Sequence, residues 1–133
     1  MLAPCEIAVK SVIPAIRACI AKELAQTHKM KQNDIANHLG ITQTAVSKYI
    51  RHVRGRVIKI DQTEEIKNMM NEIASEISNG KISGPQLTLR FCQVCQTVRR
   101  NGLMCGLCKR SDPTLDIQLC NICKNGQDCA TLT

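Results

Sequence analysis

The chain has 133 residues, a formal net charge of +7, 44% hydrophobic residues and only 2% aromatic residues. This length suits one ordinary domain or two small ones, and a core almost free of aromatic rings suits packed helices. No apolar run is long enough to span a bilayer, and the N-terminus lacks a signal-peptide pattern. The sequence therefore predicts a cytoplasmic protein that does not bind membranes.

The positive charge lies in the first half of the chain. Residues 1–60 hold ten Lys/Arg and three Asp/Glu, residues 61–90 hold three and five, and residues 91–133 hold five and three. A basic excess of this kind is typical of a protein that binds a polyanion such as nucleic acid. The sequence contains no paired carboxylates, nucleophile–base set or phosphate loop, so we do not expect an enzyme.

Residues 1–60 are predicted to form a helical DNA-binding domain. Pro4 and Pro14 each suit the first turn of a helix, where the missing N–H costs nothing. After Pro14, apolar residues including Ile16 and Leu24 recur at helical spacing. Cys19 falls on the same face and is expected in the core.

The stretch QNDIANHLGITQTAVSKYIR, residues 32–51, predicts two short helices with a tight turn between them. Gly40 can adopt the positive φ that such a turn needs. Thr42 is a good N-cap for a second helix from Gln43 to about Arg51, with Val46 facing inward. An ordinary helical hairpin with a glycine turn would carry the same signals.

This stretch resembles the helix-turn-helix of the lambda-repressor and Cro (XRE-type) class. The resemblance implies that the second helix enters the major groove of double-stranded DNA and that the protein binds as a homodimer. The residues implied to contact base edges are Gln43, Thr44, Ser47 and Lys48. Those implied to contact phosphates are Gln32, Arg51, His52, Arg54, Arg56 and Lys59.

Residues 61–79 predict one amphipathic helix. Asp61 and Glu64 have the spacing of a capping box, and Gly80 suits the end of the helix. Apolar residues such as Ile66 and Ile73 fall on one face, which would pack on the first segment or form a dimer contact. Residues 80–90 contain Gly84–Pro85 and are predicted to be a linker.

Residues 91–133 are predicted to be a small, irregular, cysteine-rich region that binds metal. Nine cysteines in a reducing compartment argue for metal or redox chemistry over structural disulfides. Three C-x2-C units recur in this region. The candidate metal ligands are Cys92, Cys95, Cys105, Cys108, Cys120, Cys123 and Cys129.

The cysteine spacings support two kinds of centre. The run FCQVCQTVRRNGLMCGLC resembles a zinc ribbon, with two C-x2-C pairs on one ion. The run CNICKNGQDC, with Cys105 or Cys108 upstream, resembles the WhiB-like regulators, which implies a 4Fe–4S cluster. Seven thiolates are one short of two four-ligand sites, so Cys5 is either an eighth ligand or a small buried residue.

The chain as a whole resembles a family of archaeal transcription regulators. That resemblance is carried by Pro4–Cys5–Glu6–Ile7, residues 32–51 and the cysteines from Cys92 onward. We expect a mostly α protein: a helical bundle with a helix-turn-helix, then the cysteine-rich region. The expected function is sequence-specific regulation of transcription, with DNA binding modulated by an iron–sulfur cluster. Alternatives are a structural zinc ribbon, used for stability or for binding a partner such as transcription machinery, and a thiol–disulfide switch.

Overall fold

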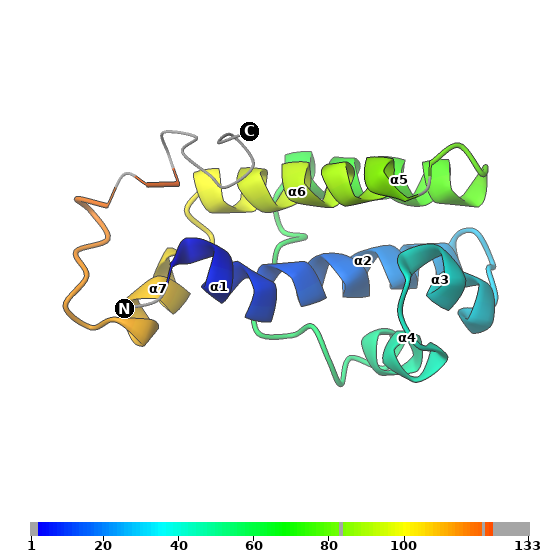
Figure 1. Ribbon diagram of the computed structural model, residues 1–133, viewed down its shortest axis with the longest axis horizontal. Helices are drawn as coiled ribbons and strands as arrows, with labels where there is room; N and C mark the ends of the chain where they lie inside the picture. Colours follow the sequence, from blue (N-terminus) through cyan, green and yellow to red (C-terminus); the bar gives the residue numbers. More distant parts are fainter. Residues whose placement is uncertain (1–2, 83, 121, 124–133) are drawn as a thin grey trace.

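The computed structural model describes residues 3–82, 84–120 and 122–123. Within those residues the chain forms helices and no strands, which confirms the expectation of a mostly helical protein (Figure 1). The helices are α1 (Pro4–Lys10), α2 (Val12–Gln26), α3 (Gln32–Leu39), α4 (Gln43–Ile50), α5 (Glu64–Ser78), α6 (Pro85–Arg100) and α7 (Cys105–Ser111). None of these helices is long and apolar enough to cross a bilayer.

The first two helices follow one another with a break at Ser11. Pro14 lies in the first turn of α2 and has no N–H to donate to the carbonyl of Lys10, so a continuous helix would lose that bond. The Ser11 hydroxyl is buried and donates to the Ile7 carbonyl at 2.7 Å. This bond ties Ser11, at the break before α2, to the last turns of α1.

The core surrounds α2. Its fully buried side chains include Val12, Ile16, Ile20 and Leu24, which match the predicted helical spacing. Helices α4, α5 and α6 all pack against α2. Cys19, predicted to be a core residue, is half-buried and packs against the edge of the core.

Helix α5 confirms the predicted amphipathic helix, and its apolar face is buried inside this chain. Ile66, Met70, Ile73 and Ile77 are buried, so intrachain packing, and not a dimer contact, covers this face. The capping box at Asp61 and Glu64 is wrong: the N-cap is Thr63, and no side chain caps the helix.

The predicted linker over residues 80–90 is also wrong in its second half. Gly84 and Pro85 begin the 16-residue helix α6, with Pro85 in its first turn, where a proline is tolerated. The cysteine-rich region is therefore helical at its start, since α6 carries Cys92 and Cys95 and α7 follows with Cys105 and Cys108. Residues 101–104 form a turn between these helices, and the described residues after Ser111 form no helix.

The helix pair α3 and α4, predicted to bind DNA, and the cysteine-bearing helix α7 lie at opposite ends of α2. Helices α3 and α4 lie beside its C-terminal end, whereas α7 lies beside α1 at the other end (Figure 1). Helices α5 and α6 form an antiparallel pair along one side of α2 and cover the core between these ends (Figure 1).

Candidate nucleic-acid interface and cysteine cavity

Helices α3 and α4 are joined by a turn whose geometry follows from the local sequence. Gly40 adopts φ +66° and ψ +33°, the left-handed conformation that glycine tolerates best. Thr42 is the N-cap of α4, and its hydroxyl accepts a hydrogen bond from the Ala45 amide at 3.1 Å. Both sequence predictions for this turn are confirmed.

The second helix of this pair, α4, has one buried side and one open side. Ala45, Val46 and Tyr49 are buried against the rest of the chain. Gln43 and Thr44 are exposed, while Ser47 and Lys48 are half-buried. The four residues proposed to contact bases thus lie away from the core, on the N-terminal turns and outer side of α4.

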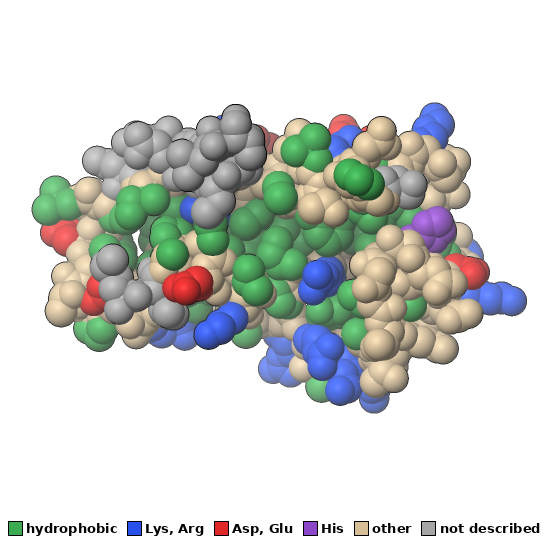
Figure 2. All heavy atoms as spheres, in the orientation of Figure 1, with side chains coloured by type: hydrophobic (Ala, Val, Ile, Leu, Met, Phe, Trp, Pro, Cys, Tyr) green, Lys and Arg blue, Asp and Glu red, His purple; other side chains and the backbone are tan. Residues whose placement is uncertain are grey.

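A basic loop follows α4 directly, with Arg51, His52, Arg54, Arg56 and Lys59 all exposed. Arg51 donates from Nε to the Ser47 carbonyl at 3.4 Å, and Arg56 donates to the His52 carbonyl at 3.3 Å. The guanidinium of Arg54 lies 5.9 Å from the centre of the Tyr49 ring, within cation–π range. These contacts hold three of the cations close to the end of α4. In Figure 2, Lys and Arg side chains gather along the lower edge of the molecule.

The loop encloses a basic crevice against α2, with a volume of about 410 Å³. Lys22 of α2 donates from Nζ to Nδ1 of His52 at 2.7 Å and so joins the cations of the loop. Sequence analysis missed Lys22 because a single lysine on a helix carries no local sign of what it faces. Gln32, the other predicted phosphate contact, is half-buried in the first turn of α3.

At the far end of α2, four cysteines of the described part of the chain line one cavity of about 260 Å³. Cys105 and Cys108 come from α7, and Cys120 and Cys123 come from the irregular segment after it. None of these four thiols is in a disulfide. Most of the other lining side chains are apolar, including Pro4 and Ile7 of α1, together with Ala3, Met104, Leu115, Ile117 and Ile122.

The other cysteines lie elsewhere. Cys92 and Cys95 sit in the middle of α6, half-buried and buried respectively, and neither lines this cavity. A zinc-ribbon knuckle places its C-x2-C pair in a tight turn, and the middle of a 16-residue helix is not such a turn. Cys5 is half-buried on α1, and Cys129 lies outside the described residues.

The surroundings of Cys108 both raise and lower the pKa of its thiol. Burial raises the pKa of the Cys108 thiol, and the neighbouring thiols Cys123, Cys105 and Cys120 raise that pKa further. Arg99 lowers it, because a cation favours the thiolate. Arg99 is buried at the end of α6, lines the cavity and donates to the Cys5 sulfur at 3.8 Å. Its position was not visible from sequence.

The residues around the cavity suit a group bound through sulfur. Four thiols with apolar walls are the donor set preferred by zinc and by iron–sulfur clusters. Among the described residues, however, no three Cys, His, Asp or Glu side chains are arranged to hold a metal ion.

A different environment surrounds Cys19 beside the basic crevice. Burial, and then the negative charge of Asp61, raise the pKa of this thiol from its ordinary value of 9.0 to about 11, against the opposing effect of Lys22. Cys19 therefore stays protonated at neutral pH and cannot serve as a metal ligand without losing that proton at a cost.

Comparisons of this chain with protein-family models, with curated proteins and with solved structures find no match.

Proposed function

We propose that this protein is a sequence-specific DNA-binding regulator of transcription. The observation that carries the proposal is the pair α3 and α4, joined at a left-handed glycine, with the uncovered side of α4 presenting Gln43 and Thr44. A helix held in this way can enter the major groove of B-DNA, where each base pair offers a distinct pattern of donors and acceptors.

Side-chain chemistry on α4 supports base reading. A glutamine amide can pair with the N6 and N7 atoms of adenine, and a lysine can donate to O6 or N7 of guanine. Gln43 and Lys48 carry these groups on a helix whose opposite side is buried. The Thr44 and Ser47 hydroxyls can both donate and accept, so they can adapt to either strand.

The basic loop supports phosphate contact beside α4. Its cations follow the last turn of α4, so they would meet the DNA backbone when α4 enters the groove. Lys22 adds a further cation from α2 through its contact with His52. Contacts of this kind position the protein on the duplex and make its affinity fall with salt.

We further propose that the protein binds DNA as a homodimer. One helix in the groove touches only a few base pairs, and regulators of this kind use two copies on half-sites one helical turn apart. The apolar face of α5 is covered within the chain, so a dimer would have to use another surface.

A thiolate-bound cofactor in the cysteine-rich region would make DNA binding conditional. A 4Fe–4S cluster is favoured over zinc and over a thiol–disulfide switch. Such a cofactor regulates only if the loaded and stripped proteins bind DNA with different affinities. The support for this part is the donor chemistry of the cysteine cavity and its position on α1, which leads into α2.

Selection from a random duplex library tests the DNA-binding proposal. The full chain, incubated at low salt, should enrich one sequence motif, with two-fold symmetry if it binds as a dimer. Gln43→Ala should relax the preference at one base pair and weaken binding to the selected site by about 1–3 kcal/mol. Gln86→Ala is the matched control, since Gln86 is an exposed glutamine on α6 and should leave the motif unchanged. Failure to retain any duplex would overturn the proposal.

A structural zinc site is the second candidate, with the C-terminal region serving stability or a protein partner such as transcription machinery. It is favoured by the two C-x2-C pairs that line one cavity, since paired units of this kind bind zinc in many small domains. A colourless protein that retains zinc and binds DNA equally well with and without it would support this candidate.

A further inference from the structure

We propose that Cys105, Cys108, Cys120 and Cys123 are the four ligands of a single 4Fe–4S cluster that fastens the segment 105–123 onto helix α1. The regulatory consequence of this assignment rests on the proposed function, but the ligand set itself does not. It selects four of the six candidate cysteines that the structure describes and gives the cluster a mechanical role.

The first step is the grouping of the thiols. Two C-x2-C pairs, one on α7 and one in the segment after Asp112, face the same cavity. Each thiol that ligates iron releases its proton to solvent and binds as the thiolate.

The second step distinguishes a cluster from a single ion. One zinc ion requires four sulfurs at about 2.3 Å from a common centre. The four cysteines instead line a cavity of about 260 Å³, which is far more space than a single ion fills. A cluster of iron and sulfide fills space and presents four separate iron atoms to four thiolates, so it suits donors spread around a wall.

The third step concerns the surroundings of the four sulfurs. The cavity walls are largely apolar, and an apolar shell limits solvent access to a bound metal group. Arg99 lines the same wall, and a positive charge there favours thiolates over neutral thiols. Cys92 and Cys95 line no part of this cavity and are therefore excluded from the ligand set.

The fourth step concerns what the cluster joins. Part of the wall consists of Ala3, Pro4 and Ile7, which belong to the start of the chain and to α1. Arg99 also donates to Cys5 of α1, so α6 contacts the same helix at this wall. A bound cluster would hold Cys120 and Cys123 next to α1, and its loss would release them. Because α1 leads into α2, and α2 packs on α4, occupancy of the site can affect the position of α4.

Reconstitution of the full chain with iron and sulfide under anaerobic conditions tests the ligand set. The wild type should turn brown and hold about four iron atoms and four sulfides per chain. Cys105→Ser and Cys120→Ser should each reduce bound iron roughly tenfold or more, because each removes a ligand. Cys92→Ser is the matched control and should load like the wild type. Cys120 lies outside the helices, so Cys120→Ser gives the same test if Cys105→Ser does not fold.

Hydrogen exchange of the loaded and stripped proteins tests the attachment to α1. Backbone amides of α1 and of residues 105–120 should exchange more slowly when the cluster is present, and this difference should vanish in Cys120→Ser. Equal iron loss in Cys92→Ser and Cys105→Ser overturns the ligand set. A colourless zinc-loaded product overturns the cluster, and unchanged exchange in α1 overturns the attachment. Duplex binding is measured separately, so its absence would contradict the proposed function and leave the ligand set standing.

Discussion

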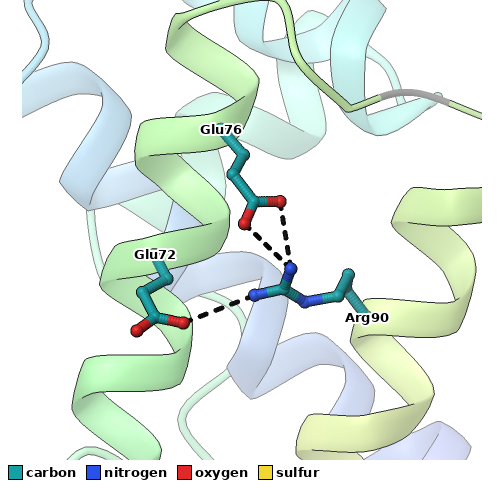
Figure 3. Close-up of polar contacts among 3 residues, drawn as sticks. All are labelled: Glu72, Glu76 and Arg90. Carbon is teal, nitrogen blue, oxygen red and sulfur yellow. Dashed lines mark hydrogen bonds and ion pairs between the residues drawn. The ribbon is translucent and has the colours of Figure 1, made fainter.

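Arg90 on α6 donates from one guanidinium nitrogen to both carboxylate oxygens of Glu76 on α5, at 2.8 and 3.0 Å (Figure 3). The other terminal nitrogen of Arg90 lies 3.6 Å from a carboxylate oxygen of Glu72, which precedes Glu76 on α5 by one helical turn (Figure 3). Arg90 and Glu76 are both about one-third exposed or less, whereas Glu72 is largely exposed. This ion pair joins the two helices that cover α2.

Because the pair with Glu76 is partly shielded from water, Arg90→Gln should lower the free energy of unfolding by about 1 kcal/mol. Glu72→Gln should cost less, since an exposed carboxylate at the longer distance gains little from the contact. Urea unfolding of both variants measures the two values. Equal losses for Arg90→Gln and Glu72→Gln would show that the bond to Glu76 contributes no more to stability than the contact with Glu72.

Two glycines with similar φ angles should respond differently to substitution by alanine. Gly40 has φ +66° and open space where a Cβ would lie, so Gly40→Ala should cost about 1 kcal/mol of stability from backbone strain. A Cβ at Gly55, with φ +78°, would lie 2.6 Å from the Pro14 carbonyl oxygen and 2.9 Å from the Ala18 Cβ. Gly55→Ala should therefore cost about 3 kcal/mol. Thermal unfolding checks the order, and similar losses would contradict it.

The hydrogen bond made by the N-cap of α4 should contribute measurably to the stability of the protein. Thr42→Ala removes the acceptor for the Ala45 amide and should lower the free energy of unfolding by about 1 kcal/mol. Thr42→Ser keeps the hydroxyl and should stay within a few tenths of a kcal/mol of the wild type. Chemical denaturation of the two variants separates the hydrogen bond from the methyl group.

The raised pKa of Cys19 should appear in its reactivity. With a pKa of about 11 in place of 9.0, the thiolate fraction at about pH 8 falls roughly a hundredfold, so alkylation of Cys19 should be slower by about that factor. Urea should restore ordinary reactivity, and mass spectrometry of digested samples locates the label. Fast labelling of Cys19 in the folded protein would show that its thiol is not shielded as described.

The raised pKa of Cys19 also makes the folding stability depend on pH. Below about pH 9 the thiol is protonated in both the folded and the unfolded chain, and its contribution to stability is fully present. Between about pH 9 and 11 the unfolded chain loses this proton while the folded chain keeps it, so stability falls. Cys19→Ala should show a smaller decline over that window when urea unfolding is repeated across pH.

Salt dependence separates the cations of the basic loop from the residues proposed to read bases. Arg51→Ala and Arg56→Ala should each reduce the slope of log K against log salt by about 0.9, because each removes one phosphate contact. Gln43→Ala should leave the slope unchanged while weakening the selected site. Lys67→Ala, an exposed lysine on α5, is the control for nonspecific charge. A slope that changes equally in Lys67→Ala would contradict a localised interface.

The turn between α3 and α4 could be predicted because its signals are local. Gly40 and Thr42 each act on backbone within a few residues, and the buried positions Ala36 and Val46 follow helical spacing. The core face of α5 was predictable for the same reason. What covers that face was not, since packing and dimer contacts leave the same pattern in sequence.

The start of α6 was missed because its signal has two interpretations. A Gly–Pro pair is typical of a linker, but glycine before proline also suits an N-cap and the first helical position. The apolar positions Leu87, Val94 and Val98 that continue the helix are buried in the structure.

The grouping of the cysteines depends on tertiary structure. Spacing along the chain pairs Cys92 and Cys95 with the next C-x2-C unit, whereas the fold turns α6 away and brings Cys120 and Cys123 to that unit. The position of Arg99 at the cavity wall also depends on tertiary structure. A lone charged residue in sequence has no sign of which cavity it will reach.

The 15 residues of α2 make a spacer about 22 Å long between the two ends of the molecule. Each residue inserted into such a spacer would turn one end by about 100° relative to the other. The angular register between the cysteine cavity and α4 is thus set by a residue count. We expect natural variants of this chain to change length in the loops around α2, and to keep α2 itself at constant length.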